Sequence, residues 1–330
     1  MKLGVLSAIP HFEPGLAFPV GAYTHCGMNP PQFIFRPNSA FSLVFAFLIA
    51  AVVLVSKLPA EELHHSVHRD IVFAEVNGQK LALDLYLPGK QTGPLIVWVH
   101  GGAWRGGSKS DMPLGHLLQE GFAIASVDYR LSGVAPFPAQ SHDIKSAIRF
   151  LRSKGSELGV NADRIAISGA SAGGHLAQIV GLTNGNAELE GDVGVTGVSS
   201  DVQAIVSFFG MSDFTTLLQQ STPHGLSMRV PALQLFLGGQ PDEKPELARL
   251  ASPVFHVSAK SPPLLLIHGD ADPQAPFEQS KELEAAYKKE GARVQFETIQ
   301  GGRPRRREVL RRQADRARKA VPERGSSLSR

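Results

Sequence analysis

A serine between two glycines is the residue of this sequence whose setting best suits chemistry. Residues 164–177 read Arg-Ile-Ala-Ile-Ser-Gly-Ala-Ser-Ala-Gly-Gly-His-Leu-Ala and contain the pattern Gly169-x-Ser171-x-Gly173. A serine at a sharp strand-to-helix turn holds its hydroxyl clear of the sheet, and the crowded backbone there requires glycine-like neighbours. The apolar run 165–167 and the small residues after the pattern supply that strand and helix. We therefore predict that Ser171 is a nucleophile, against the alternative of a Gly-Ser turn without chemistry.

A second glycine-rich segment is suited to stabilising the negative charge that such a nucleophile would create. The apolar run 95–99 is followed by His-Gly-Gly-Ala-Trp at 100–104. Backbone N–H groups that bind an oxyanion must reach the substrate without obstruction by side chains, and adjacent glycines after a strand allow this. The free N–H groups at the start of the helix after Ser171 favour negative charge as well.

These two motifs, in this order, resemble those of the α/β-hydrolase esterases with an HGG-type oxyanion loop. The resemblance covers about residues 70–302 and is strongest to the branch of bacterial feruloyl and acetyl-sugar esterases. It implies a carboxylesterase- or lipase-like serine hydrolase that cleaves small-molecule carboxylic esters through an acyl-enzyme on Ser171. It also implies that backbone N–H groups of Gly101 or Gly102 and of Ala172 hold the oxyanion.

The acid partner is expected in the loop after the apolar run 263–267, which reads His-Gly-Asp-Ala-Asp-Pro-Gln-Ala-Pro at 268–276. A carboxylate at the end of a strand can orient a histidine and stabilise its imidazolium form. In the related esterases the acid stands three residues before a Val-Pro or Ala-Pro step, which makes Asp272 the expected residue. Asp270 is the rival, and we expect it to be a turn carboxylate. The order of Ser171 and Asp272 agrees with the Ser–Asp–His order of this fold.

The base that the resemblance requires is missing from the sequence. Related esterases carry a Gly-His loop after the last strand, but this sequence reads Gly-Arg-Pro-Arg-Arg-Arg at 302–307, and its last histidine is His268. Without a base within hydrogen-bonding reach, a serine hydroxyl is a weak nucleophile at neutral pH. We therefore expect the chain to be impaired as an enzyme.

No other histidine is expected to replace this base. His100 is expected to brace the oxyanion loop, and His175 lies one helical turn beyond Ser171, where its side chain points away from the hydroxyl. His142 and His256 are expected to be surface or packing residues. His224 is expected to lie in the cap, and His268 is expected to be buried beside the acid loop.

The pattern of apolar segments predicts how these residues are positioned. Strands alternating with helices favour an α/β-hydrolase fold, with a mainly parallel twisted sheet, helices on both faces and a small cap at 211–250. The dipeptide Asn77-Gly78 between two strand-like runs predicts a hairpin. The expected strands are 70–75, 80–87, 95–99, 122–127, 165–167, 202–209, 263–267 and 293–299, and the expected helices are 112–119, 141–154 and 277–290.

Composition excludes several classes of function. Apolar residues make up 43% of the 330, enough for a sizeable core, and the single Cys26 allows no intrachain disulfide. No Cys/His cluster has ligand spacing, so we expect no metal and no cofactor. Residues 303–330 hold 10 Arg and 1 Lys against 3 acidic residues, which gives them a charge of +8. Since the net charge of the whole chain is +3, residues 1–302 carry −5. A mildly acidic body does not indicate a nucleic-acid-binding protein.

The arginine-rich tail at 303–330 is predicted to lie outside the fold, which leaves 61–302 as the hydrolase domain. It has two interpretations. It is either a basic extension that binds acidic surfaces, or the product of a shifted reading frame near Gly302 that replaced the histidine loop and a terminal helix.

The first 60 residues are predicted to form an N-terminal extension with an export signal. Residues 41–56 contain no charge, follow Arg36 and resemble a long signal h-region, with cleavage expected after Ala60. The protein is then expected in the periplasm or outside the cell, with membrane contact only through 41–56. An uncleaved anchor and a buried core helix are the alternatives, and translation is suspected to start at Met28.

Two other functions stay open at this point. The loop at 268–276 also resembles the prolyl and dipeptidyl peptidases, although the HGGAW segment and the lack of a propeller-sized N-terminal domain speak against them. A protein that kept the fold, lost the triad and only binds is the third hypothesis.

Overall fold

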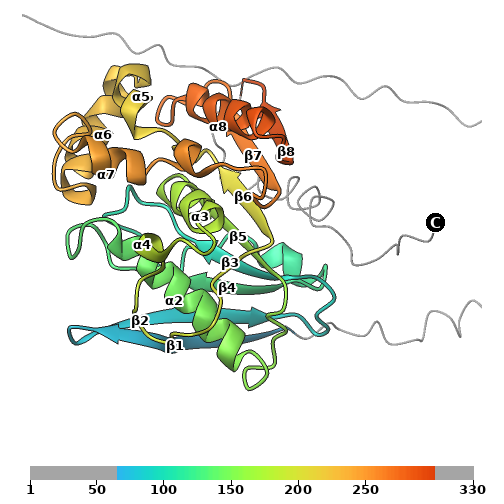
Figure 1. The fold of residues 1–330 in the computed structure, drawn as a ribbon. Helices are drawn as coiled ribbons and strands as arrows, with labels where there is room; N and C mark the ends of the chain where they lie inside the picture. Colours follow the sequence, from blue (N-terminus) through green and yellow to red (C-terminus); the bar gives the residue numbers. More distant parts are fainter. Residues whose placement is uncertain (1–64, 302–330) are drawn as a thin grey trace, which may run out of the picture. The chain divides into compact units, whose positions relative to one another are not determined.

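A computed structural model describes residues 65–301, in which a single eight-stranded sheet is flanked by helices (Figure 1). In the order along the sheet the strands run β1-β2-β4-β3-β5-β6-β7-β8. The pairs β1–β2 and β2–β4 are antiparallel, and all later neighbours are parallel. The strands are β1 Ser66–Val76, β2 Gln79–Leu87, β3 Leu95–Val99, β4 Ala123–Val127, β5 Ile165–Ala170, β6 Ala204–Phe208, β7 Leu264–Gly269 and β8 Val294–Ile299.

The helices alternate with the parallel strands, and three of them form the cap. The α-helices are α2 Ala139–Lys154, α3 Ala172–Leu182, α4 Ala187–Glu190, α5 Phe214–Gln220, α6 Pro223–Phe236, α7 Pro245–Leu250 and α8 Phe277–Lys289, and the 3-10 helices are η1 Gly115–Leu118 and η2 Pro253–His256. The predicted cap at 211–250 therefore contains α5, α6 and α7. None of the helices in residues 65–301 is long and apolar enough to cross a membrane.

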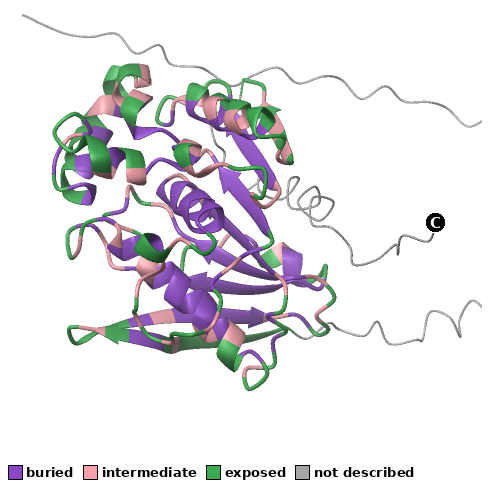
Figure 2. Ribbon diagram, viewed as in Figure 1, coloured by how far each residue is buried: buried purple, intermediate pink, exposed green. Residues whose placement is uncertain are grey.

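The central strands are buried because both faces of the sheet are covered. Every residue of β3, β4, β6 and β7 is buried, whereas most of β1 is exposed at the sheet edge (Figure 2). In β3 the side chains alternate: Leu95, Val97 and Val99 join the core under α2 and α3, while Ile96 and Trp98 pack with η1 on the other face. Runs that are apolar at every position are typical of such doubly covered parallel sheets. The predicted α/β architecture is confirmed.

The hairpin and most of the predicted elements are found, but one helix was wrong. Asn77 and Gly78 take positive φ angles of 50° and 80° in the turn between β1 and β2. The expected helix at 112–119 is only the 3-10 turn η1. The segment is held instead by Trp98, whose indole N–H donates to the Asp111 carbonyl at 2.7 Å.

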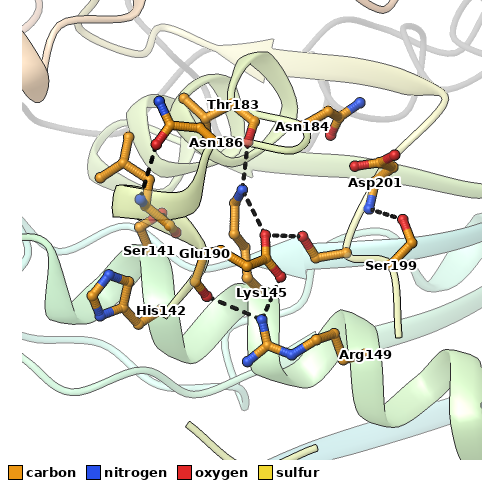
Figure 3. Close-up of polar contacts among 12 residues, drawn as sticks. Ser141, His142, Lys145, Arg149, Thr183, Asn184, Asn186, Glu190, Ser199 and Asp201 are labelled. Atoms are coloured by element: carbon orange, nitrogen blue, oxygen red, sulfur yellow. Dashed lines mark hydrogen bonds and ion pairs between the residues drawn. The ribbon is translucent and has the colours of Figure 1, made fainter. Parts of the chain in front are cut away.

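The chain between α3 and β6 is tied to α2 by buried charges (Figure 3). Lys145 and Arg149 are fully buried in α2, and both reach Glu190 at the end of α4, at 3.2 and 2.5 Å. Arg149 also donates to the carbonyls of Val193 and Val195, and the Ser200 hydroxyl donates to Glu190 at 2.7 Å. One carboxylate therefore compensates two buried cations.

Replacing Glu190 by Gln should destabilise the fold by about 3 kcal/mol, because it leaves two buried cations without an anion. For a domain of this size the melting temperature should fall by about 6–12 °C. Thermal unfolding checks this, with Glu188→Gln as the control, since that neighbouring carboxylate is exposed. Equal melting temperatures for the two variants would show that the cluster contributes nothing.

The same cluster predicts acid sensitivity. Burial alone would raise the pKa of Glu190, but Ser200, Lys145 and Arg149 outweigh it and hold that pKa below the usual 4.5. Burial also lowers the pKa of Lys145 despite Glu190, because Lys145 is the more deeply buried partner. A carboxyl group whose pKa is lower in the folded state than in the unfolded state stabilises the fold at pH values above its unfolded-state pKa. That contribution is lost as the pH falls through its folded-state pKa. The stability gap between wild type and Glu190→Gln should therefore shrink below about pH 4.5.

Candidate active site

The loops that follow the parallel strands bring the predicted site residues to one edge of the sheet. Ser171 follows β5, the HGGAW segment follows the neighbouring strand β3, and Asp272 lies three residues after β7. Only β6 separates β5 from β7. At the usual spacing of strands, β5 and β7 lie roughly 10 Å apart, a gap that two side chains and an intervening imidazole can bridge. The carboxyl edge of a parallel sheet is where α/β proteins bind their ligands.

Ser171 sits in a strained turn that glycines make possible. Its backbone has φ 56° and ψ −120°, a conformation that costs free energy for any residue with a side chain. A methyl group at Gly169 would overlap the Gly173 carbonyl, and one at Gly173 would overlap the Val99 carbonyl. The Ser171 N–H donates to the Phe208 carbonyl at 2.9 Å, which holds the turn against β6. Within residues 65–301 the Ser171 hydroxyl makes no hydrogen bond, so it is available to a ligand.

The HGGAW segment lies directly beside this turn. A Cβ built on Gly101 would stand 3.6 Å from the Ser171 Cβ and 2.8 Å from the Ala170 carbonyl oxygen. Gly102 has φ +115°, where a side chain would overlap the Gly106 carbonyl. Neither the Gly102 N–H nor the Ala172 N–H donates to a carbonyl of the described residues. Both groups are therefore free to bind an oxygen atom.

His100 braces this segment, as expected. Its Nδ1 donates to the Gly101 carbonyl at 2.8 Å, and its ring stacks on Tyr129 with 4.4 Å between ring centres. The Tyr129 hydroxyl donates to the His100 carbonyl at 3.1 Å. Burial lowers the pKa of His100 and raises that of Tyr129, so both rings stay neutral at physiological pH.

His175 is fully buried and links α3, the HGGAW segment and the cap. The Trp104 indole N–H donates to His175 Nδ1 at 3.1 Å, and His175 Nε2 donates to the Ala251 carbonyl at 2.7 Å. Phe214 and Phe236 of the cap pack against the same ring. Burial lowers the pKa of His175 to about 4. With both nitrogens bonded and a ring that resists protonation, His175 cannot act as the base.

Asp272 is ionised and its carboxylate is fixed in place. One oxygen accepts from the Gln274 and Ala275 N–H groups at 2.7 and 3.0 Å. The other lies 3.7 Å from His268 Nε2, outside hydrogen-bonding distance. Burial acts to raise the pKa of Asp272, but His268 and the two N–H groups outweigh it and lower that pKa.

His268 is bonded within the acid loop and does not face Ser171 as a free base. Its Nε2 donates to the Ala275 carbonyl at 3.1 Å, and its Nδ1 accepts from the Ser280 hydroxyl at 2.7 Å. Asp270, the rival acid, accepts from the Gly301 N–H at 2.8 Å, which agrees with a turn role. It thereby holds the chain after β8 next to the acid loop, where a Gly-His loop would begin.

The remaining histidines singled out by sequence lie away from this edge or on the surface. His142 bonds the Glu188 carbonyl at 3.0 Å, and His256 bonds the Leu250 carbonyl at 2.7 Å. His224 is exposed on α6. The structure therefore places Ser171, the glycine segment and Asp272 at the same edge of the sheet. Within residues 65–301 it supplies no histidine to connect them. Residues 303–330 and 41–56 lie outside the described residues.

Sequence reasoning missed one residue of this edge, Arg229 of α6. It is buried in the cap and feels the charge of Asp272. A signal was present: Arg229 is the only Asp, Glu, Lys or Arg between 214 and 240. A single charged residue in a stretch of this length is a signal that the sequence itself contains.

Comparison with known proteins agrees with the geometry. The BD-FAE family model matches residues 83–287, a range that contains Ser171, Asp272 and the HGGAW segment. LipM of Mycobacterium tuberculosis, a probable carboxylic ester hydrolase, is 35% identical over 202 residues, which are 60% of this chain and 45% of LipM. The chain spans about half the length of the curated relatives it matches.

Solved structures show the same fold. A truncated carbohydrate esterase from gut microbiota superposes with a TM-score of 0.70 at 30% identity, over 80% of this chain and 99% of that one. An esterase from Thermogutta terrifontis, Est2, superposes with a TM-score of 0.59 at 26% identity, over 80% and 92%.

Proposed function

Since this chain belongs to the BD-FAE family of α/β-hydrolase esterases, we propose that residues 61–302 form a serine hydrolase that cleaves small-molecule carboxylic esters. The observation that carries this is the approach of Gly101 to Ser171, where a built Cβ would stand 3.6 Å from the Ser171 Cβ. The neighbouring Gly102 and Ala172 N–H groups have no carbonyl acceptor among the described residues. No other polar group of the described loops competes for that hydroxyl.

In the proposed reaction the Ser171 oxygen attacks the ester carbonyl carbon and forms a tetrahedral intermediate. The N–H groups of Ala172 and of Gly102 or Gly101 donate to the oxyanion, and the start of α3 adds its dipole. The C–O bond to the alcohol then breaks and leaves an acyl-enzyme, which water hydrolyses by the same route. Asp272 is ready to orient an imidazolium, because it is ionised before any histidine arrives.

The chain as it stands lacks the group that moves the protons. Nothing after His268 can serve as an imidazole base, and the three buried histidines near this edge are held in other roles. We attribute the loss to a shifted frame near Gly302 in preference to a basic extension, because the change begins where the histidine loop is due. The scaffold is therefore that of an esterase that lacks the histidine expected between Ser171 and Asp272.

A non-catalytic binding protein is the second candidate, favoured by the same lack of a free histidine. A prolyl-type peptidase is disfavoured because the relatives are named as ester hydrolases.

Added imidazole should distinguish these functions. It should raise hydrolysis of 4-nitrophenyl acetate by the 330-residue chain at least tenfold above the same imidazole with Ser171→Ala, because a free imidazole can stand between Ser171 and Asp272. The same assay with a proline 4-nitroanilide substrate should show no gain. Equal rates for wild type and Ser171→Ala at every imidazole concentration would favour the binding protein.

Export is proposed from the uncharged run at 41–56, which follows Arg36. The native protein should begin near Glu61 and lie in the periplasm or outside the cell, or stay anchored by an uncleaved signal. N-terminal sequencing of protein from the source cells, with fractionation, measures both. An intact Met1 in the cytoplasmic fraction would contradict the proposal.

A further inference from the structure

The cap helix α6 carries a buried cation without a partner. Arg229 is 7% exposed, and its Nε is fully buried with no hydrogen-bond acceptor. Within residues 65–301 its guanidinium forms neither a hydrogen bond nor an ion pair. A guanidinium has five N–H donors, and a fully buried donor such as the Nε–H of Arg229 is costly to leave without an acceptor. A fold tolerates such a cost where something outside the chain supplies the acceptor.

Helix α6 holds this arginine between the two loops of the active site. At its first turn, the Thr222 hydroxyl donates to the Pro273 carbonyl of the acid loop at 2.9 Å. At its last turn, Phe236 stacks on Trp104 of the HGGAW segment with 4.6 Å between ring centres. Arg229 lies seven residues before Phe236, on the same buried face of the helix.

The guanidinium itself lies beside the acid loop. A Cβ built on Gly225 would stand 2.8 Å from Arg229 Nη1 and 3.5 Å from the Gln274 carbonyl oxygen. The Asp272 carboxylate is near enough to act on the charge of Arg229. It forms no hydrogen bond or ion pair with Arg229 in the described residues, and one of its oxygens accepts from the Gln274 and Ala275 N–H groups. Burial lowers the pKa of Arg229 to about 10, partly offset by Asp272, so Arg229 stays a cation at neutral pH.

We propose that Arg229 binds a carboxylate carried by the substrate, so that the site selects esters of dicarboxylic or otherwise anionic compounds. This rests on the proposed esterase function and names its substrate class. A planar guanidinium matches a carboxylate through two parallel hydrogen bonds, and in a buried site that pairing is stronger than in water. A site built to satisfy such donors rejects a neutral analogue, because the donors then stay unpaired.

The binding test uses a charged ester and its neutral counterpart. Monomethyl glutarate and dimethyl glutarate are titrated into the 330-residue chain at matched ionic strength, and Kd is taken from calorimetry and from the shift in melting temperature. The wild type should bind the monoester at least tenfold more tightly than the diester. Arg229→Gln should lose that tenfold preference, whereas Arg249→Gln should keep it, since Arg249 is a cap arginine that lies over the Phe255 ring.

A second readout separates binding from a structural role. Without ligand, Arg229→Met should melt at or above the temperature of the wild type, because it removes a buried cation that has no acceptor. A lower melting temperature for Arg229→Met, or an equal preference for the monoester in Arg229→Gln, would overturn the proposal. Binding needs no turnover, so these outcomes are independent of the imidazole assay on Ser171.

Discussion

The 330-residue chain should hydrolyse 4-nitrophenyl acetate about 10⁶-fold more slowly than an esterase with a complete triad. In subtilisin, loss of the triad histidine costs about 10⁶ in kcat, or roughly 8 kcal/mol of transition-state stabilisation. The same loss is expected here, because His100, His175 and His268 are held by the Gly101, Ala251 and Ala275 carbonyls. Only the residual effect of the oxyanion donors should remain, about 10³–10⁴ over water.

Initial rates measured with purified chain and with Ser171→Ala check this expectation. If the chain reaches ordinary enzymatic rates and Ser171→Ala does not, another histidine is the base. His100 and His268 would be the first to replace by Gln, since His100 directly follows β3 and His268 lies near the carboxyl end of β7. A pH profile adds to the test for His100, because burial lowers its pKa and the rise in rate would then come below pH 6.5 if His100 were the base.

A histidine restored after Gly302 should recover turnover by several orders of magnitude, up to the roughly 10⁶ that its loss costs. The change is Arg303→Gly with Pro304→His, which recreates the Gly-His step of related esterases. Asp270 already holds the Gly301 N–H beside the acid loop, so the new imidazole starts close to Asp272. The rate of 4-nitrophenyl acetate hydrolysis is again the measurement, and Arg303→Gly with Pro304→Ala is the matched control.

The restored chain also decides between the two carboxylates. In it, Asp272→Asn should lower kcat by about 10⁴, the effect of such a change in a complete triad. Asp270→Asn should lower it far less, since its role is to hold the turn. The opposite order would make Asp270 the acid. If the variant with Pro304→His is as slow as its control with Pro304→Ala, a terminal helix has to be restored together with the histidine. If the chain with both restored is still as slow, the explanation of low activity by a missing base is refuted.

The parts of the fold and site that could be predicted are those that depend on neighbouring residues in the sequence and on the local conformation of the backbone. Gly169 and Gly173 are readable because any side chain there would overlap a carbonyl, and the hairpin is readable because Asn77 and Gly78 accept positive φ. The buried strands are readable because their apolar runs are continuous. The helix at 112–119 was mispredicted because its periodic leucines pack with Trp98 from a segment in which only Gly115–Leu118 forms a 3-10 turn.

What could not be predicted depends on residues that meet only in three dimensions. Trp104 and His175 are 71 residues apart, and their bond fixes the neutral form of that histidine. The position of Arg229 over the acid loop depends on α6, which has almost no apolar stripe to reveal its buried face, since both faces carry apolar residues. The lone charge was visible in the sequence, but its lack of an acceptor was not.

The most direct test of the central claim is the site of covalent labelling. The chain with Arg303→Gly and Pro304→His is treated with a fluorophosphonate, digested and mapped by mass spectrometry. The account predicts one adduct, on the Ser171 oxygen, with labelling slowed by several orders of magnitude when Pro304 is replaced by Ala instead. An adduct on any other residue, or ester hydrolysis by a chain whose Ser171 stays unlabelled, would contradict it.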